Sequence, residues 1–579
     1  MRTEMSDRYK VMFIIFVSLG IYYPSIFGGV NSVDDYQLIT TLINTDHISL
    51  REIFFPMGPV YYYRPILSLS FISDRLIFNC SEFYMHLNNI ILHTINGVLI
   101  FFIVREILRI FKVSNSHYIP MFASLLFIVH PINTESVNWI SGRTDVLAGL
   151  FVFLSFLVFI KKGLENHIWC WISAIFYLMG LLTKETAIGF ILVIGLFLFL
   201  KENAIKDISI KKKIALFFPF LIMTITYFFM RTITSNNPDT GIIKAAQAFG
   251  NDTLFIHIGS IIKAFGFYIK KVFVPLPLNF GIIEINRTFY FWFGIISLGF
   301  TLYLLFVKRT LLSFLLFFSV AFFLPSLPVA TAKMAWTPLA ERYLYISSFG
   351  VSLLIIFSFF RLFARENLRY GILALLLFVA SLITVNRNII WQDNLTLYKD
   401  TIEKSPNFAV ARNEYGIALF INGKPDEALE QFKIAEKLAG ETKYKDLLSV
   451  NITGLFSDQM KPEEAKEQYL KLLEKTPLRP ISLKALQNLI KIAETQLKKE
   501  SDSNKKEALY REILSYFRQI YELERDSFYL YRIGQYHLAL GEKEKAIESF
   551  KEAVKLSPDE YYSEPARKLV RKLESENSD

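Results

Sequence analysis

Long apolar segments alternate with short charged ones over the first two thirds of this chain. Apolar runs of about 17–22 residues are long enough to cross the hydrocarbon layer of a membrane as helices. The segments expected to do so are 11–28, 87–104, 118–132, 144–160, 168–183, 185–200, 214–230, 291–307, 310–327, 343–360 and 371–385. The pattern therefore predicts an all-α, polytopic membrane bundle of about eleven transmembrane helices.

One further apolar segment, residues 254–274, differs from these spans because it carries several basic residues. Lys263, Lys270 and Lys271 lie within it, and it runs into the sequence VPLPL, whose prolines interrupt a helix. We therefore expect this segment to be an interfacial or re-entrant helix that does not cross the membrane.

From Asn386 onward a repeat of about 34 residues replaces the apolar runs. Two copies share a glycine followed by small residues and one aromatic residue at matching offsets: Gly416, Ala428, Phe432 and Ala435, and Gly534, Ala546, Phe550 and Ala553. A weaker copy has Ala465, Tyr469 and Pro477, and residues 480–526 read as a longer hairpin. The pattern is typical of tetratricopeptide repeats. It predicts a membrane domain over 1–385 and an α-solenoid over 386–579.

The composition agrees with this division. The 579 residues are 53% hydrophobic and 16% aromatic, more than soluble globular chains usually carry. The net charge of +10 indicates membrane topology rather than nucleic-acid binding, because no soluble module carries a basic stripe interleaved with aromatic residues. Two cysteines give neither a disulfide framework nor a metal-binding spacing.

Basic residues predict the orientation, because cytoplasmic connections are enriched in Lys and Arg. The connections with this character are 105–112, 161–162, 201–213, 308–309 and 361–369. All of them are cytoplasmic only if the basic segment 254–274 does not cross. The N-terminus is then inside, and the repeats lie on the non-cytoplasmic face. The Phe-, Ile- and Lys-rich composition favours a bacterial inner membrane with periplasmic repeats; the alternative is the endoplasmic reticulum membrane.

The outer loops of this topology gather ionisable residues near membrane depth, where such residues are costly and indicate function. These residues are Asp34, Asp35, Arg64, Glu135, Arg143, Asp145, Lys184, Glu185 and Arg342. Arg and Lys can bind the phosphate of a lipid carrier, and a carboxylate can take a proton from an attacking hydroxyl. We predict that Asp35 is the catalytic base, with Asp34 as its helper. The other seven residues are predicted to bind the donor's phosphate and sugar.

The same residues also have structural interpretations. Adjacent Lys184 and Glu185 are explained equally well by an ion pair at a helix end, and Asp34 by a helix N-cap. His130, which precedes a proline, fits a cap for a free backbone group. Two acids beside a phosphate can hold a divalent cation, although no ligand spacing here demands one.

Several stretches occur in an order that identifies a known family. They are the VDD stretch after the first span, YYYRPILSLSF, HPINTESVNWISGRTDVLAGL, LLTKETAIGF, VPLPLNF, ERYLYISSFG and NRNIIWQDNLTLY. The chain resembles the transmembrane and tetratricopeptide repeat-containing O-mannosyltransferases over nearly its whole length. The segment HP-x-x-TE-x-V…GR-x-DVLA is the most specific part of this resemblance.

The resemblance implies a C-type glycosyltransferase fold and a sugar donor linked to a polyprenyl or dolichyl phosphate. It also implies that a carboxylate of the first outer loop is the base, which falls on Asp34 or Asp35. In the family, mannose is transferred to Ser or Thr of proteins. We expect an inverting hexosyltransferase whose repeats recruit a protein acceptor.

Two other functions fit the sequence. An enzyme of the same fold could glycosylate a lipid or a surface polysaccharide, with the repeats binding an assembly partner. A non-catalytic scaffold could bind proteins through its repeats, but a scaffold does not need the charged cluster on the outer face. A transporter fits less well, because the charges gather at one face and no inverted repeat of broken helices is visible.

Overall fold

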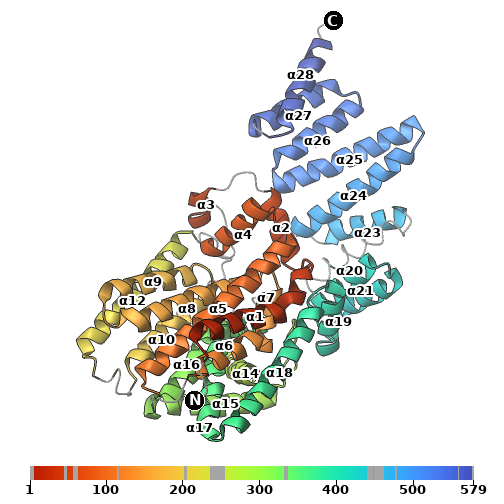
Figure 1. Cartoon of the computed structure of the whole chain (residues 1–579). Helices are drawn as coiled ribbons and strands as arrows, with labels where there is room; N and C mark the ends of the chain where they lie inside the picture. The colour runs from red at the N-terminus through yellow and green to blue at the C-terminus, as the bar shows by residue number, and fades with distance from the viewer. Residues whose placement is uncertain are drawn as a thin grey trace. The chain divides into compact units, whose positions relative to one another are not determined.

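The computed structural model describes residues 5–44, 49–56, 63–113, 117–200, 205, 207–234, 254–308, 310–330, 337–439, 448, 462–475, 479–558 and 560–576. Over these residues the regular structure is helical, and the one isolated β-bridge joins Ile282 and Leu339. The prediction of an all-α fold is confirmed. The chain divides into two compact units, Met1–Glu414 and Tyr415–Asp579, whose helices Figure 1 labels.

Seven described helices are long and apolar enough to cross a membrane. They contain α1 (Asp7–Tyr22), α5 (Glu82–Ile110), α8 (Arg143–Val158), α12 (Ile210–Thr234), α15 (Arg287–Tyr303), α16 (Leu311–Phe323) and α18 (Glu366–Ile390). Shorter apolar helices cover the remaining predicted spans: α6 (Ile119–Val129), α9 (His167–Leu181), α10 (Gly189–Leu198) and α17 (Ser347–Leu362). Every predicted span therefore falls on an apolar helix.

Of the predicted cytoplasmic connections, residues 201–204, 206 and 309 lie outside the described residues.

Aromatic side chains fill much of the interior of this bundle. Phe156 on α8 packs edge-on against Phe190 and Phe197 of α10, with ring centroids 6.0 and 5.9 Å apart. All three side chains are fully buried. Such edge-to-face pairs are favourable because the positive ring edge meets the negative ring face. The phenylalanine-rich composition is thus used for packing between helices.

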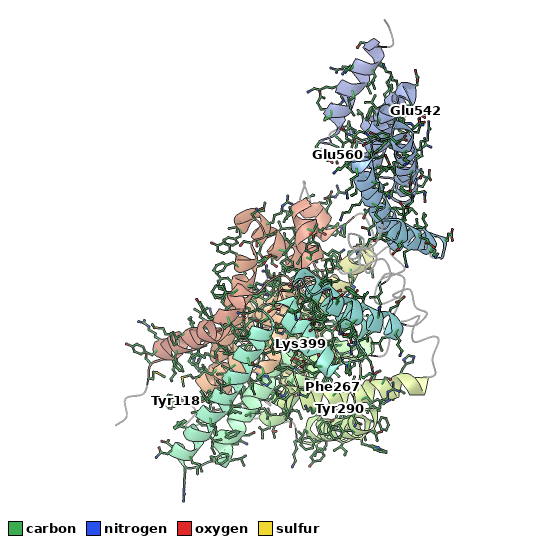
Figure 2. All side chains as sticks on the ribbon, turned by 90° about the vertical axis from the view of Figure 1, so that its right-hand side faces the viewer. Tyr118, Phe267, Tyr290, Lys399, Glu542 and Glu560 are labelled. Carbon is green, nitrogen blue, oxygen red and sulfur yellow. The ribbon has the colours of Figure 1, made fainter. Side chains whose placement is uncertain are left out.

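The helix α14 (Leu254–Phe273) occupies the segment that was expected to be interfacial. It is not among the described helices that are apolar enough to cross a membrane, so its interfacial position stays a prediction. It packs closely along α15, because a Cβ on Gly294 would lie 2.2 Å from the Ile262 carbonyl oxygen. Figure 2 labels Phe267 and Tyr290, whose rings meet at 5.5 Å across this helix pair.

The second unit contains the antiparallel helix hairpins that the 34-residue period predicts. They are built from α21 (Pro425–Ala439), α23 (Pro462–Lys475), α24 (Arg479–Lys499), α25 (Ser503–Glu524), α26 (Ser527–Ala539), α27 (Lys543–Leu556) and α28 (Ser563–Glu576). The aromatic residues of the two clear copies, Phe432 and Phe550, are fully buried. Pro477 of the weaker copy lies outside the described residues.

The contacts divide the chain after Glu414, whereas the apolar pattern ends near residue 385. The helix α19 (Asn394–Lys404) therefore belongs to the first unit. Its side chains bond to the N-terminal loop of that unit, as described below. The border at 385 remains a prediction of where the repeat region begins.

Replacing Gly534 with Ala is expected to loosen the last clear repeat, because an added Cβ would lie 2.6 Å from the Phe550 ring. Such overpacking typically costs about 1–3 kcal/mol. Hydrogen exchange of the intact protein should show faster exchange in α26 and α27. Glu548→Ala on the exposed face of α27 is the matched control. Equal exchange rates in both variants would contradict the packing role of the glycine.

Candidate functional site

Six of the charged residues singled out in the sequence meet in three ion pairs at one end of the membrane bundle. The pairs join segments that are 39 to 207 residues apart. They are Arg64 with Glu185 at 2.8 Å, Lys184 with Asp145 at 2.6 Å, and Arg342 with Glu135 at 2.5 Å. These ion pairs therefore join loops that are distant in the sequence.

In the pair of Glu135 and Arg342, the carboxylate is almost completely buried. Glu135 is the second residue of the short helix α7 (Thr134–Asn138), and its exposed fraction is 1%. Its carboxylate accepts hydrogen bonds from the Arg342 guanidinium and from the backbone N–H groups of Glu341 and Arg342. Burial raises the pKa of Glu135, although the Arg342 charge opposes that rise. The guanidinium also lies 5.0 Å from the Trp139 ring centroid, so it is held on two sides.

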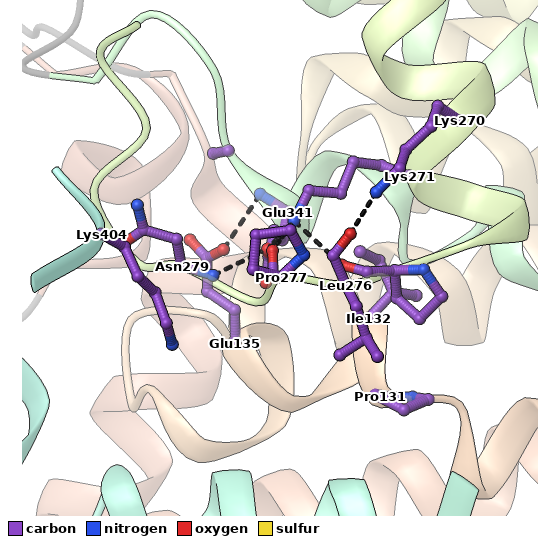
Figure 3. Close-up of polar contacts among 12 residues, drawn as sticks. Pro131, Ile132, Glu135, Lys270, Lys271, Leu276, Pro277, Asn279, Glu341 and Lys404 are labelled. Atoms are coloured by element: carbon purple, nitrogen blue, oxygen red, sulfur yellow. Dashed lines mark hydrogen bonds and ion pairs between the residues drawn. The ribbon is translucent and has the colours of Figure 1, made fainter. Parts of the chain in front are cut away.

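Beside this pair, Lys271 of α14 supports the chain that carries Arg342. Figure 3 shows Lys271 directed toward Glu341 and the proline-rich loop. Its ammonium group lies 2.5 Å from the Glu341 carboxylate and donates to the carbonyl groups of Pro275 and Pro277. Because Glu341 is the neighbour of Arg342, the loop and α14 together fix the position of that arginine.

The pair Lys184–Asp145 is also buried, with 4% and 3% exposure. Both Asp145 oxygens accept hydrogen bonds from Lys184, at 2.6 Å each. Burial lowers the pKa of Lys184 to about 8, and the Asp145 charge opposes that fall. Since the charges of Arg64 and Arg342 also lower the pKa of Lys184, the three cations lie within electrostatic reach of one another. The three positive groups are each paired with a carboxylate.

Arg143 takes a different position from the other predicted binding residues. It is 1% exposed, and its guanidinium donates to Asp74, to the Asn89 side chain and to the Met85 carbonyl. The distance to Asp74 is 2.5 Å. With these partners Arg143 joins α4 (Pro65–Phe78), α5 and α8. Asp74 of α4 and Asn89 of α5 are the polar residues through which the sequence could have indicated this buried network.

Asp35 and Asp34 have opposite surroundings. Asp35 starts the helix α2 (Asp35–Asn44) and is 1% exposed. Its carboxylate accepts hydrogen bonds from the backbone N–H and the hydroxyl of Ser141, at 2.9 and 2.5 Å, and from the Asn31 N–H at 3.3 Å. Burial raises the pKa of Asp35 to about 6. These bonds tie the first outer loop to the segment that precedes α8.

Asp34 is exposed, and its carboxylate makes no hydrogen bond or ion pair with the described residues. Its backbone carbonyl accepts from the Leu38 N–H, so it occupies the cap position of α2 without a side-chain cap. The surrounding protein displaces water and raises the pKa of Asp34, while the charges of Arg342 and Arg64 lower it. The free carboxylate therefore lies within electrostatic reach of the cation cluster.

Residues about 370 positions away hold this loop in place. Tyr398 of α19 donates its hydroxyl to the Asn31 side chain at 3.0 Å. The Ser32 hydroxyl donates to the Glu414 carboxylate at 2.6 Å and lies 3.1 Å from the Tyr398 hydroxyl. The Asn394 amide donates to the Val30 carbonyl. Tyr398 ends the stretch NRNIIWQDNLTLY, but nothing local to it or to Glu414 indicates partners so distant in the sequence.

His130 serves as a structural cap. Its ring nitrogen accepts the backbone N–H of Ile132 at 3.3 Å. Within the described ranges, no group of three or more His, Cys, Asp or Glu side chains is arranged to hold a metal ion.

Replacing Asp35 with Asn is expected to change stability in a pH-dependent way. Because its pKa is raised, the folded protein binds its proton more tightly than the unfolded chain between about pH 4 and pH 6. Its contribution to stability is therefore full below that window and falls as pH rises through it. Relative to the variant, the wild type should lose about 3 kcal/mol of folding free energy as the pH rises through this window. Thermal unfolding in detergent between pH 4 and 7 measures this; a pH-independent difference would contradict it.

Comparison with known proteins identifies repeats and relatives. Residues 397–430 and 527–560 each match the model of the tetratricopeptide repeat. The first match begins inside α19 and the second covers α26 and α27. The tetratricopeptide repeats predicted from the sequence are therefore confirmed in these two stretches, and the weaker copy and the hairpin over 480–526 stay predictions.

The chain is also similar to proteins named O-mannosyl-transferases. It is 24% identical over 455 residues to human Protein O-mannosyl-transferase TMTC3, covering 70% of this chain and 48% of the relative. It is 25% identical over 408 residues to Protein O-mannosyl-transferase F38B6.6 of Caenorhabditis elegans, covering 65% and 54%. A shorter match, to Protein O-mannosyl-transferase tmtc2 of Xenopus laevis, reaches 34% over 167 residues, which is 27% of this chain and 19% of that protein. The chain spans about half the length of the human and nematode relatives.

Proposed function

Because this chain belongs to the family of transmembrane, tetratricopeptide repeat-containing proteins that includes these O-mannosyl-transferases, we propose that it is a multi-pass membrane glycosyltransferase. It moves mannose or another hexose from a polyprenyl or dolichyl phosphate to a Ser or Thr hydroxyl of a protein. The reaction takes place on the non-cytoplasmic face. The observation that carries this proposal is the free carboxylate of Asp34 within electrostatic reach of Arg64 and Arg342.

In this reaction Asp34 is the general base. It accepts the proton of the acceptor hydroxyl as that oxygen forms a bond to the anomeric carbon of the sugar. The bond between the anomeric carbon and the phosphate oxygen breaks, and its electron pair leaves with the lipid phosphate. Attack from the face opposite the leaving group inverts the anomeric carbon. The lipid phosphate departs with an additional negative charge.

The cations stabilise that departing charge. Arg64 and Arg342 are held by Glu185 and Glu135, so their guanidinium groups are oriented before the donor binds. Preorganised cations of this kind lower the barrier because they need not rearrange as charge develops. Lys184 adds a third positive group, which Asp145 positions.

The two aspartates then have separate roles, and these reverse the preference drawn from the sequence. Asp35 is enclosed and already accepts three hydrogen bonds, so it cannot reach an acceptor hydroxyl without breaking them. Asp34 has no such partners among the described residues. We therefore assign the proton transfer to Asp34. Asp35 is a positioning residue, because its bonds to Ser141 fix the loop that carries the base.

The repeats recruit the protein acceptor to the membrane domain. Solenoids of helix hairpins present extended surfaces that commonly bind peptides or proteins. The setting favoured by the sequence is a bacterial inner membrane, with the repeats in the periplasm. There the acceptor is an exported protein that carries exposed Ser or Thr.

Mass spectrometry of envelope proteins and glycolipids tests the function in cells. Cells with the wild-type chain should contain proteins that carry hexose on Ser or Thr, and cells without the chain should lack them. Cells with the Asp34→Asn chain should also lack proteins that carry this hexose. Hexose that disappears from glycolipids or polysaccharide, while proteins are unchanged, would contradict a protein acceptor. No change in any glycan would contradict the enzyme itself.

Replacing Tyr398 with Phe is expected to lower kcat roughly tenfold with little change in the KM for the donor. The variant loses the hydroxyl that bonds Asn31, so the loop carrying Asp34 is less well positioned. Steady-state kinetics of purified protein measure the two constants. Tyr84→Phe, at an exposed position of α5, is the control. An unchanged kcat in Tyr398→Phe would contradict the positioning role.

A further inference from the structure

A groove of about 530 Å³ lies where the last apolar helix of the bundle meets α19. It belongs entirely to the first unit. Three segments line it: the loop that follows α14, the C-terminal part of α18, and α19. The lining residues include Leu276, Ile383, Arg387, Ile390, Asp400 and Lys404. None of the roles proposed above uses this groove.

One wall of the groove is apolar. It is formed by the C-terminal part of α18 and by the loop that follows α14. Ile383, Arg387 and Ile390 are separated by four and three positions, so they share one face of α18. Leu276 of the loop is 45% exposed and adds to the apolar wall. Nearby faces of α18 expose Leu382, as expected for a helix in contact with lipid. The wall thus suits a hydrocarbon chain.

The other wall is positively charged. Asp400 pairs with both Arg387 and Lys404, at 2.5 Å each, so two cations share one carboxylate. Arg387 is 3% exposed, and its Nε atom is buried without a hydrogen-bond partner in the described parts of the chain. A buried donor without an acceptor is costly. An anion at this wall would accept that hydrogen bond and balance the extra positive charge.

We propose that this groove binds a lipid whose headgroup carries a phosphate. The phosphate oxygens accept from Arg387 and Lys404, and the first carbons of the chain lie against Leu276, Ile383 and Ile390. An apolar wall beside a cationic one matches such a lipid at the membrane surface. An acidic peptide would leave the apolar wall without a partner.

One loop connects the groove to the candidate catalytic centre. Leu276 and Pro277 line the groove, and the carbonyl of Pro277 accepts a hydrogen bond from Lys271. Lys271 in turn pairs with Glu341, which precedes Arg342 (Figure 3). A lipid in the groove therefore supports the loop that bonds to Lys271. Lys271 in turn holds Glu341, the neighbour of Arg342, which is proposed to bind the donor. Binding itself does not depend on the chemistry assigned to Asp34.

Native mass spectrometry of the full-length protein in detergent tests the proposal. The probes are a polyprenyl phosphate, phosphatidylglycerol, phosphatidylcholine and inorganic phosphate, each titrated separately. Lys404→Glu should weaken binding of the phosphate-headed lipid at least tenfold. Lys399→Glu is the matched control, because Lys399 is exposed on the same helix, is labelled in Figure 2 and does not line the groove. Arg387→Met, checked for folding by its unfolding temperature, should show the same loss as Lys404→Glu.

The order of affinities identifies the source of the lipid. Tighter binding of polyprenyl phosphate assigns the groove to the carrier lipid, and tighter binding of phosphatidylglycerol assigns it to the surrounding membrane; both support the proposal. Equal losses in Lys404→Glu and Lys399→Glu would overturn it. So would inorganic phosphate that competes as well as either lipid. Asp34→Asn should bind the lipid normally, so an inactive enzyme that still binds separates this site from the catalytic proposal.

Discussion

Replacing Asp34 with Asn is expected to reduce sugar transfer by about 10³-fold or more, while the protein remains folded. General bases typically contribute about 10²- to 10⁴-fold to a rate, and Asn cannot accept the proton. The Asp34 carboxylate makes no bond with the described residues, so its loss removes no contact from the fold. The rate of hexose transfer from a polyprenyl-phosphate sugar to a Ser- and Thr-containing acceptor measures the effect.

Asp35→Asn is the control for this experiment. Its carboxylate is buried and accepts hydrogen bonds from Ser141 and Asn31, so the variant should lose stability. Its remaining folded fraction should retain more activity than Asp34→Asn. An Asp35→Asn protein that is fully stable and inactive, beside an active Asp34→Asn, would show that the roles of the two aspartates are exchanged.

Removing the charges of Arg342 and Glu135 together is expected to lower kcat by about 10²- to 10³-fold. The proposed transition state loses a preorganised cation, and comparable losses follow removal of a single stabilising donor in other enzymes. Arg342→Met alone would leave Glu135 buried without its counterion, which commonly costs about 3–5 kcal/mol. The double variant Glu135→Gln with Arg342→Met avoids that isolated charge. In the double variant, kcat should therefore fall without a matching fall in the unfolding temperature.

Arg342→Lys completes this series. Lysine keeps the charge, but it cannot reproduce the planar fork of the guanidinium. We expect an intermediate kcat, between the wild type and the double variant. A double variant with wild-type kcat would exclude Arg342 from stabilising the leaving phosphate.

The sequence predicted the helical bundle well because its signals are local. Apolar runs require only neighbouring residues, and each predicted span falls on an apolar helix. The repeats were equally accessible, because Gly534 and Phe550 recur at the same offset as Gly416 and Phe432. Their close packing follows from the small residue opposite the ring. Patterns of this kind reflect packing between neighbouring helices of one hairpin, so they can be read from the sequence.

The site was predicted less completely, because its geometry depends on partners that are distant in the sequence. Charge and topology indicated which loops carry the polar residues, and three ion pairs join them. The sequence did not distinguish Arg143, whose guanidinium is enclosed by Asp74 and Asn89, from the other arginines. Nor did it show that Ser141 encloses one of two adjacent aspartates and leaves the other free. Such differences arise only when the loops pack together.

Transfer by the purified wild-type and Asp34→Asn proteins is the most direct test of the account. Both are supplied with a labelled hexose on a polyprenyl phosphate and with a Ser- and Thr-containing envelope protein, and the acceptor is examined by intact mass. The wild type is expected to add hexose to the acceptor, and Asp34→Asn, equally folded, is expected to add almost none. Equal transfer by the two proteins would contradict the role of Asp34, and no consumption of any lipid-linked sugar by the wild type would contradict the proposed enzyme.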